Sequence, residues 1–295
     1  MAQNYAAAHD EFLKAQLAGL PFLPAVERLS PTVIRILGGN PGKFALQGTN
    51  TYLLGTGSPR LLIDTAQGLP PWRASLSTVL ASESTSISSA LLTHYHHDHI
   101  GGIPDLLALS PTTLLHKHTP EPDQLPIVDG QEFTVPGATL RAIHTPGHTH
   151  DHISFLLLEE NAVFTGDTVL GHGTTVFEDL AAYMGSLARL QELNAGRLYP
   201  AHGAVVEDGP RKLAEYVRHR KLRENQVVRT LAQMRDGASS MEIVKTIYSD
   251  VGVELHKAAE NGVRQVLEKL EGEGKVVRRE VDGLIVWVLQ EPPKL

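Results

Sequence analysis

Apolar positions along this chain follow two alternating periods. Short runs of β-branched and aliphatic residues, separated by turns that contain glycine or proline, predict strands, and apolar residues spaced by three and four positions predict helices. The predicted strands cover residues 32–37, 49–54, 61–63, 87–92, 113–116, 138–143, 153–158 and 162–164. The predicted helices among them cover residues 70–81, 103–109 and 179–193.

The pattern changes after about residue 203, where helices dominate. The helices predicted there cover residues 210–234, 239–248 and 254–270, and two alternating strands follow at 275–280 and 284–289. Ser240 and Glu242 mark the start of the middle helix, and Asp282-Gly283 is a strong hairpin signal between the strands. Three helices followed by a hairpin are in the order of a winged-helix module.

Charge is spread unevenly and supports the same division. Residues 1–210 carry 10 Lys and Arg against 20 Asp and Glu, whereas residues 211–290 carry 15 against 12. The break near residue 210 is a candidate domain boundary. We therefore expect an N-terminal arm at residues 1–30, with a short helix or loosely held segment at 1–18, a main domain at 31–209 and a winged-helix-like C-terminal domain at 210–295.

Composition excludes several classes of site. Of the 295 residues 42% are apolar, which is enough for a sizeable core, and none is cysteine. Disulfides, thiolate metal sites and a cysteine nucleophile are therefore excluded. The first twenty or so residues lack the apolar stretch of a secretory signal, and the chain has no apolar run of the roughly 18 residues that a membrane span needs. We expect a cytoplasmic protein without a membrane partner.

The densest chemical signal is the sequence THYHHDHIGG at residues 93–102, which directly follows a predicted strand. Imidazole and carboxylate groups are good ligands for a divalent ion such as zinc. A strand that ends where a turn begins would aim several of them at one point. The candidate ligands in this H-x-H-x-D-H spacing are His94, His96, Asp98 and His99. His97 is expected to point to the surface.

Four further positions extend the pattern. Asp64, His148, Asp167 and His202 each follow an apolar run at a turn with glycine or proline close by. Such turns bring the backbone close to an ion and hold side chains rigidly. His172, between Gly171 and Gly173, is a candidate for the wall of a substrate pocket. His150 and His152 are expected to make structural hydrogen bonds.

Taken in this order, the motifs resemble those of the metallo-β-lactamase superfamily over roughly residues 30–205. The resemblance implies an α/β fold, the αβ/βα sandwich, with a two-metal site at one edge. It implies that the main domain is catalytic. Asp167 would bridge both metals, and Asp64 would orient the site by hydrogen bonds without binding metal. One metal would be held by His94, His96 and His148, and the other by Asp98, His99 and His202.

This ligand set predicts hydrolysis. Two cations lower the pKa of a water molecule that they share from 15.7 to about 7 or lower, so hydroxide forms at neutral pH, and one cation polarises an acyl or phosphoryl oxygen. Ligands with only nitrogen and oxygen donors admit Zn²⁺, Mn²⁺ or Fe²⁺, and zinc is the usual choice for a site rich in histidine.

Two stretches narrow the resemblance. The sequences at residues 37–52 and 164–187 look like a subgroup that contains lactamase-like protein 2 and the free-standing thioesterases of fungal aromatic polyketide pathways, of the atrochrysone carboxyl acyl-carrier-protein type. The thioesterases imply release of a polyketide acid from the acyl carrier protein domain of a polyketide synthase, by attack of a metal-bridging hydroxide. Asp98 would bind metal and relay a proton. Basic residues at 211–223 would meet the acidic carrier.

Other functions stay open. The lactamase-like protein 2 relatives imply cleavage of single-stranded RNA, although the charge of the C-terminal part is modest and no aromatic residues interleave its basic helix. A small thioester or lactam hydrolase is a further alternative. The C-terminal part could also bind DNA, but its third helix is acidic. We expect this part to pack over the active site and shape its mouth.

Overall fold

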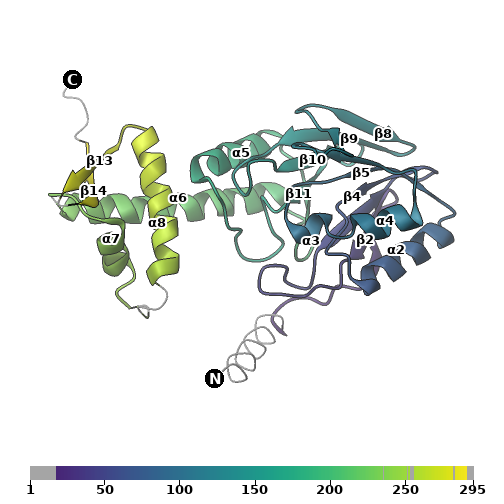
Figure 1. Ribbon diagram of the computed structural model, residues 1–295, viewed down its shortest axis with the longest axis horizontal. Helices are drawn as coiled ribbons and strands as arrows, with labels where there is room; N and C mark the ends of the chain where they lie inside the picture. Colours follow the sequence, from purple (N-terminus) through teal and green to yellow (C-terminus); the bar gives the residue numbers. More distant parts are fainter. Residues whose placement is uncertain (1–17, 235, 251, 253–255, 282, 291–295) are drawn as a thin grey trace.

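The protein is described here by a computed structural model, which covers residues 18–234, 236–250, 252, 256–281 and 283–290. Its main part consists of two mixed sheets that pack face to face (Figure 1). The first sheet contains, in spatial order, β1 (Val26–Arg28), β2 (Val33–Leu37), β3 (Asn50–Leu54), β4 (Arg60–Ile63), β5 (Ile87–Leu91), β6 (Leu114–Lys117) and β7 (Leu125–Pro126). The second contains β12 (Arg197–Pro200), β11 (Ala162–Gly166), β10 (Ile153–Leu157), β9 (Ala138–His144) and β8 (Glu132–Val135).

The core between the sheets is apolar on both inner faces. Tyr52 of β3 meets Phe164 of β11 edge to face, with ring centroids 4.9 Å apart. Phe155 lies on β10, the central strand of the second sheet, and is fully buried in the same cluster. β10 and β11 are buried along their whole length, because each is covered on both faces.

Helices cover the outer face of each sheet. Two helices cover the first sheet, and buried Trp72 packs there against Ile36 and Leu62. On the second sheet, Leu187 packs in one cluster with Ile143 and Val163. The helices on the first sheet are α2 (Pro70–Ser82) and α4 (Ile103–Leu109), and those on the second are α5 (Leu180–Glu192) and α6 (Gly209–Gln233). This order of layers is the αβ/βα sandwich that the motifs predicted.

The long helix α6 joins the sandwich to the C-terminal part (Figure 1). Its N-terminal half buries Leu213 and Tyr216 beside the second sheet, and its C-terminal half buries Val227 and Leu231. One apolar cluster contains both halves, so the core continues into the C-terminal part. That part contains α7 (Ser240–Ile247), α8 (His256–Gly272) and the antiparallel strands β13 (Val276–Val281) and β14 (Leu284–Leu289).

Some elements differ from those expected. β1 lies within the expected arm and pairs with β2, and the short strands β7 and β8 and the single-turn helix α3 (His97–Ile100) had no counterpart among the predictions. α7 begins at Ser240, one residue later than the predicted start at 239, because Ser239 is its N-cap and forms a capping box with Glu242. Ser240 was wrongly predicted to mark the helix start, because a capping box needs a spacing of three positions between the N-cap residue and its Glu partner, as from Ser239 to Glu242. The helix predicted at residues 1–18 lies almost entirely outside the described residues, as does Asp282 of the predicted turn.

Candidate metal centre

The candidate ligands lie where strands of both sheets end, at one edge of the sandwich. β5 ends at Leu91, and the chain then leads to His94 and into α3. His148 lies in the loop between β9 and β10, Asp167 directly follows β11, and His202 follows β12. Residues that are distant in sequence therefore meet at one place.

The single turn of α3 directs the H-x-H-x-D-H segment towards this point. His96 has an extended backbone, with φ −62° and ψ 141°, and is the N-cap of the turn. The turn that follows carries Asp98 and buries His99. Gly102 permits close packing behind the turn, because a Cβ atom there would lie 1.9 Å from the carbonyl oxygen of Thr65.

Four residues form a first group in which one donor atom of each lies within 4.8 Å of the others: His94, His96, His148 and Asp167. Nε2 of His94 is 2.9 Å from Nδ1 of His96, which is 3.1 Å from Nε2 of His148. Oδ2 of Asp167 is 3.5 Å from the same nitrogen of His148. Three imidazoles and one carboxylate oxygen thus converge.

A second group lies beside the first and contains Asp98, His99 and His202. Oδ2 of Asp98 is 3.4 Å from Nε2 of His202 and 3.5 Å from Nε2 of His99. Oδ1 of Asp167 approaches the same two nitrogens, at 3.2 and 3.6 Å. The two oxygens of Asp167 therefore face different groups, which is the arrangement that a bridging carboxylate requires.

The unused hydrogen-bonding capacity of the cluster fits divalent cations. Nε2 of His99 and Oδ1 of Asp167 are buried and have no hydrogen-bond partner among the described residues. An unpaired buried polar atom costs about 1–3 kcal/mol, so such atoms are rare in native interiors. Ligands bound at about 2.1 Å to a tetrahedral ion lie about 3.4 Å apart. Separations of 3.2–3.6 Å match that spacing.

Neighbouring groups hold the histidine rings in place. Asp64 is buried, and its Oδ1 accepts a hydrogen bond of 2.8 Å from the backbone N–H of Thr93. Its Oδ2 lies 2.8 Å from Nδ1 of His99. The carbonyl oxygen of Val176 accepts a hydrogen bond of 2.9 Å from Nδ1 of His148. When Nδ1 is held in this way, Nε2 faces the cluster and can bind a metal. Asp64 therefore lies where an orienting residue belongs.

The cluster favours positive charge at its centre. Burial, reinforced by the nearby His99, lowers the pKa of His94 well below its ordinary value, so this ring is neutral and offers a lone pair. Burial acts in the same direction on His99, but the carboxylates of Asp64, Asp167 and Asp98 outweigh it and raise its pKa to about 10. Burial opposes ionisation of Asp167, yet His202 and His99 hold the pKa of that carboxyl well below its usual range.

Asp98 has a support that the sequence pattern did not reveal. The hydroxyl of Thr49 donates a hydrogen bond of 3.1 Å to Oδ2 of Asp98. Asn40 in turn fixes Thr49, because its Oδ1 accepts from the backbone N–H of Thr49 at 2.9 Å. Neither residue belongs to a spacing pattern, so only the fold could identify them. The side chain of Asp98 stays 30% exposed.

An open hollow of about 380 Å³ lies over the cluster. His96, Asp98 and Asp167 contribute to one side of it. Two exposed apolar side chains that also line it are Phe44 and Val176, which are 70% and 59% exposed. Lys43 and His172 also line the hollow.

The remaining histidines near the site have structural positions. His152 is fully buried, and its Nε2 accepts a hydrogen bond of 3.0 Å from the backbone N–H of Asp167. Its Nδ1 lies 2.9 Å from the hydroxyl of Thr145, so both ring nitrogens are occupied. His97 and His150 are exposed, as expected for His97.

The C-terminal helices contact the wall of the hollow. Nη2 of Arg220, on α6, donates a hydrogen bond of 2.7 Å to the carbonyl oxygen of Thr175. The guanidinium lies 4.7 Å from the ring centroid of Phe177. Gln265, on α8, donates to the carbonyl oxygen of Glu178. Arg220 was expected on an outward basic face and instead points inward. These contacts favour the expectation that the C-terminal part shapes the mouth of the site.

Comparisons with known proteins agree with this architecture. A sequence profile of the metallo-beta-lactamase superfamily matches residues 45–125 and 115–202, and a profile of the beta-lactamase associated winged helix domain matches residues 239–283. The lactamase-like protein vrtG of Penicillium aethiopicum is 50% identical over 279 residues, which are 90% of each chain. A protein of Aspergillus chevalieri, called atrochrysone carboxyl ACP thioesterase, is 46% identical over 289 residues, covering 95% of this chain and 94% of that protein.

Solved structures show the same fold. A beta-lactamase domain protein from Burkholderia ambifaria superposes with a TM-score of 0.77 and 18% identity, over 91% of this chain and 95% of that one. At that identity the likeness concerns the fold alone. Among the described residues, each helix is too short or too polar to cross a membrane.

Proposed function

The chain belongs to the metallo-β-lactamase superfamily, and from this premise we propose that it is a dinuclear metal-dependent thioesterase that releases a polyketide acid from an acyl carrier protein. The coarser statement, a hydrolase of this fold whose His and Asp cluster suits divalent metal, rests on the family and on the cluster itself. Relatives at 45–50% identity include two called atrochrysone carboxyl ACP thioesterase, which supports the thioester.

One observation carries the proposal: the two carboxylate oxygens of Asp167 face two different groups of histidines at the base of one hollow. We assign His94, His96 and His148 to one metal and Asp98, His99 and His202 to the other, with Asp167 between them. Zinc is our first choice of metal, since imidazole and carboxylate ligands suit it, and Mn²⁺ or Fe²⁺ is compatible with the same donors.

The reaction needs water activation more than it needs help for the leaving group. Bound divalent cations supply Lewis acidity towards the carbonyl oxygen and lower the pKa of water from 15.7 to about 7. A new C–O bond forms at the thioester carbonyl as the C–S bond breaks. The departing thiol has a pKa of about 8.5, so its thiolate is a good leaving group near neutral pH.

Asp98 is placed to handle the proton. Its carboxylate lies at the base of the hollow and is partly exposed, so a substrate can reach it. Thr49 donates to Oδ2, which fixes the carboxylate plane. We assign Asp98 the task of accepting the proton of the attacking water and passing it to the departing sulfur, as a positioned general base and acid.

The walls of the hollow suit an acyl group on a charged arm. Phe44 and Val176 offer exposed apolar surface to the acyl group, and His172 lies beside them. Lys43 offers a positive charge to the phosphate of the arm. On the exterior, Arg211, Arg218 and Lys221 are exposed on α6 and would meet an acidic carrier.

The test is release of acid from a loaded carrier. The full chain, depleted of metal and then supplied with two equivalents of Zn²⁺, is mixed with an acyl carrier protein that carries an aromatic polyketide thioester, and the free acid is measured by mass spectrometry. We expect metal-dependent release. Asp98→Asn should reduce its rate about 100-fold or more, because it removes the group that transfers the proton.

Controls separate the proposal from background hydrolysis. Asp105→Asn alters a half-buried carboxylate of α4 that pairs with Arg73, and it should release acid like the unaltered chain. If the metal-loaded chain released no acid from several aromatic thioesters, the proposed function would be wrong. The comparisons give no support to cleavage of single-stranded RNA. The metal-loaded chain is therefore also mixed with single-stranded RNA, and we expect no cleavage.

A further inference from the structure

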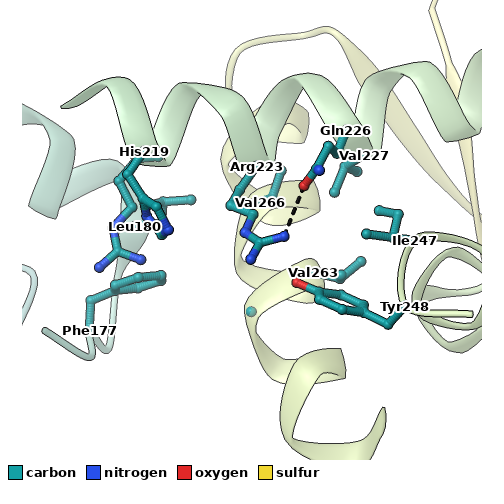
Figure 2. A pocket seen from close by; sticks show the side chains of 12 residues that line it. Phe177, Leu180, His219, Arg223, Gln226, Val227, Ile247, Tyr248, Val263 and Val266 are labelled. Atoms are coloured by element: carbon teal, nitrogen blue, oxygen red, sulfur yellow. Dashed lines mark hydrogen bonds between the residues drawn. The ribbon is translucent and has the colours of Figure 1, made fainter. Parts of the chain in front are cut away.

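A second hollow, which we call the helix pocket, lies between α6, α8 and the start of α5 (Figure 2). Its volume is about 130 Å³. Side chains that define it are Phe177, Leu180, Arg223, Val227, Tyr248 and Val263. The metal cluster does not contribute to it, so the reaction described above gives it no role.

The walls of the helix pocket are mainly apolar. Leu180, Val227 and Val263 are buried behind it, with exposed fractions of 3%, 2% and 4%. The rings of Phe177 and Tyr248 lie towards its two ends (Figure 2). Because an apolar cavity of about 150 Å³ holds a benzene molecule in another protein, this volume suits a group the size of one aromatic ring.

Two guanidinium groups border this apolar space, and that of Arg220 is already bound to the carbonyl oxygen of Thr175. The guanidinium of Arg223 lies 5.4 Å from the ring centroid of Tyr248 and donates a hydrogen bond of 3.0 Å to Oε1 of Gln226 (Figure 2). No carboxylate among the described residues pairs with Arg223. Burial, together with the charges of Arg220 and Arg223, lowers the pKa of the adjacent His219.

A glycine keeps the space open. Gly262 lines the pocket from the middle of α8, where glycine weakens a helix relative to alanine. A Cβ atom at this position would have no atom of the described residues within 4 Å. Close packing therefore does not require a glycine here, and a larger side chain would enter space that the pocket leaves open.

The helix pocket and the hollow over the metal cluster share one stretch of chain. Thr175 and Val176 line the hollow, and the next residue, Phe177, lines the helix pocket. Arg220, which also borders the helix pocket, contacts the carbonyl oxygen of Thr175 at 2.7 Å. A substrate whose thioester lies over the cluster could thus extend past this stretch.

We propose that the helix pocket binds a flat aromatic ring that carries an acidic substituent, with Arg223 as its counter-charge, and that this ring is the far end of the acyl group. The second part of this inference rests on the proposed thioesterase function. The same ring is present on the thioester and on the acid released from it, so product and substrate compete for the pocket.

Direct binding is tested on the full chain without metal, so that the cluster does not bind the probe. The probe is 3-hydroxybenzoate, titrated by ligand-observed NMR, with anisole as an uncharged ring. We expect Gly262→Leu to weaken binding of the acid at least tenfold, because the new side chain fills the space. Arg223→Gln should weaken binding of 3-hydroxybenzoate about fivefold and leave binding of anisole unchanged.

Matched controls lie elsewhere on the same kinds of element. Gly185 is exposed in the middle of α5, and a Cβ atom there also has no atom of the described residues within 4 Å. Gly185→Leu tests whether replacing a helical glycine by leucine changes binding when the glycine lies away from the pocket. Arg229 is exposed on α6, and Arg229→Gln tests the loss of one charge. Both controls should bind 3-hydroxybenzoate like the unaltered chain.

The link to catalysis is tested with the metal-loaded chain and two N-acetylcysteamine thioesters, one of an alkanoic acid that carries a 3-carboxyphenyl ring at its far end and one of acetate. The measured quantity is the ratio of their kcat/KM values. We expect Gly262→Leu to lower this ratio about tenfold, and free 3-hydroxybenzoate to inhibit the aromatic thioester competitively. Gly185→Leu should keep the ratio.

The outcomes separate the two proposals. If the acid binds and Gly262→Leu abolishes binding, but neither thioester is hydrolysed, the pocket stands as an acid-binding site and the thioesterase function falls. If both thioesters are hydrolysed while Gly262→Leu changes neither binding nor the ratio, the function stands and the pocket proposal is overturned.

Discussion

Arg220 of α6 donates a hydrogen bond of 2.7 Å to the carbonyl oxygen of Thr175, although 45 residues separate them in sequence. The next carbonyl along the chain, that of Val176, accepts a hydrogen bond of 2.9 Å from Nδ1 of His148. A helix that continues into the C-terminal part therefore holds the segment that fixes the ring of a candidate metal ligand. The C-terminal part thereby acts on the cluster without contacting a metal.

Arg220→Met should weaken metal binding without unfolding the chain. The substitution keeps most of the apolar stem but removes the donor to Thr175. Residues that orient ligands typically change metal affinity 10–100-fold, and Arg220 acts one step further away, so we expect about tenfold. Zn²⁺ affinity is measured by competition with a chromophoric chelator, with Arg229→Met as control. Equal affinities for Arg220→Met and the unaltered chain would show that the segment keeps its position unaided.

Asp64→Asn tests the orienting carboxylate directly. The amide keeps the shape of the side chain but loses the charge that faces His99, and it cannot accept at both positions. Metal affinity should fall about 10–100-fold. The same competition assay applies, with Asp105→Asn as control. If Asp64→Asn bound metal as tightly as the control, Asp64 would have only a structural task at the end of β4.

The number of bound ions tests the division of the cluster into two groups. We expect two ions per chain, measured by elemental analysis after dialysis. His96→Gln and His202→Gln should each keep about one, because each belongs to a different group. A bound ion at 100 times its dissociation constant stabilises the fold by about 2.7 kcal/mol, so a chelator should lower the Tm. One ion in the unaltered chain would contradict the dinuclear assignment.

Most of the cluster could be predicted from the sequence, because its ligands are polar residues that directly follow apolar runs. Asp167 after β11 and His202 after β12 are of this kind. Two other elements were predicted from their apolar residues: α5 has them at spacings of three and four, and β10 is a nearly continuous apolar run. Helix α3 has only four residues, which is too short for a helical period to be visible.

Other features could not be predicted from residue type. Thr175 and Val176 act through backbone carbonyl oxygens, which every residue carries. Arg220 was assigned to a charged face because α6 is basic, but the rings of Phe177 and Tyr183 attract its guanidinium inward. By contrast, the N-cap of α7 could have been predicted from the sequence, since Ser239 and Glu242 have the spacing of a capping box.

Glu83 should make stability depend on pH well away from the cluster. Hydrogen bonds from Arg28 and Arg60 lower its pKa below the ordinary 4.5. Because the folded-state pKa is below the unfolded one, the contribution is present above about pH 4.5 and is lost as the pH falls through the lower value. Urea unfolding should show Glu83→Gln less stable at pH 7, with a smaller difference at pH 3. A difference that did not change with pH would assign the effect to packing alone.

Gly102→Ala should destabilise the fold at the base of the metal cluster. The new Cβ atom would lie 1.9 Å from the carbonyl oxygen of Thr65 and 2.7 Å from the ring of Trp72, both of which are buried. The backbone N–H of Thr65 donates to the carbonyl oxygen of His99 at 2.8 Å, so relief of the clash must separate the segments that carry Asp64 and His99.

Overpacking costs about 1–3 kcal/mol in most interiors, and we expect the upper end here because the obstacle is backbone. Urea unfolding of the metal-free chain measures the change. Gly185→Ala is the matched control, since its Cβ meets open space in an exposed part of α5 and should stabilise the chain by up to about 1 kcal/mol. Gly102→Ala should also bind metal more weakly than Gly185→Ala. Equal stability and equal affinity in the two variants would mean that the Thr65 segment can move away freely, and that the close approach at Gly102 does not hold the cluster together.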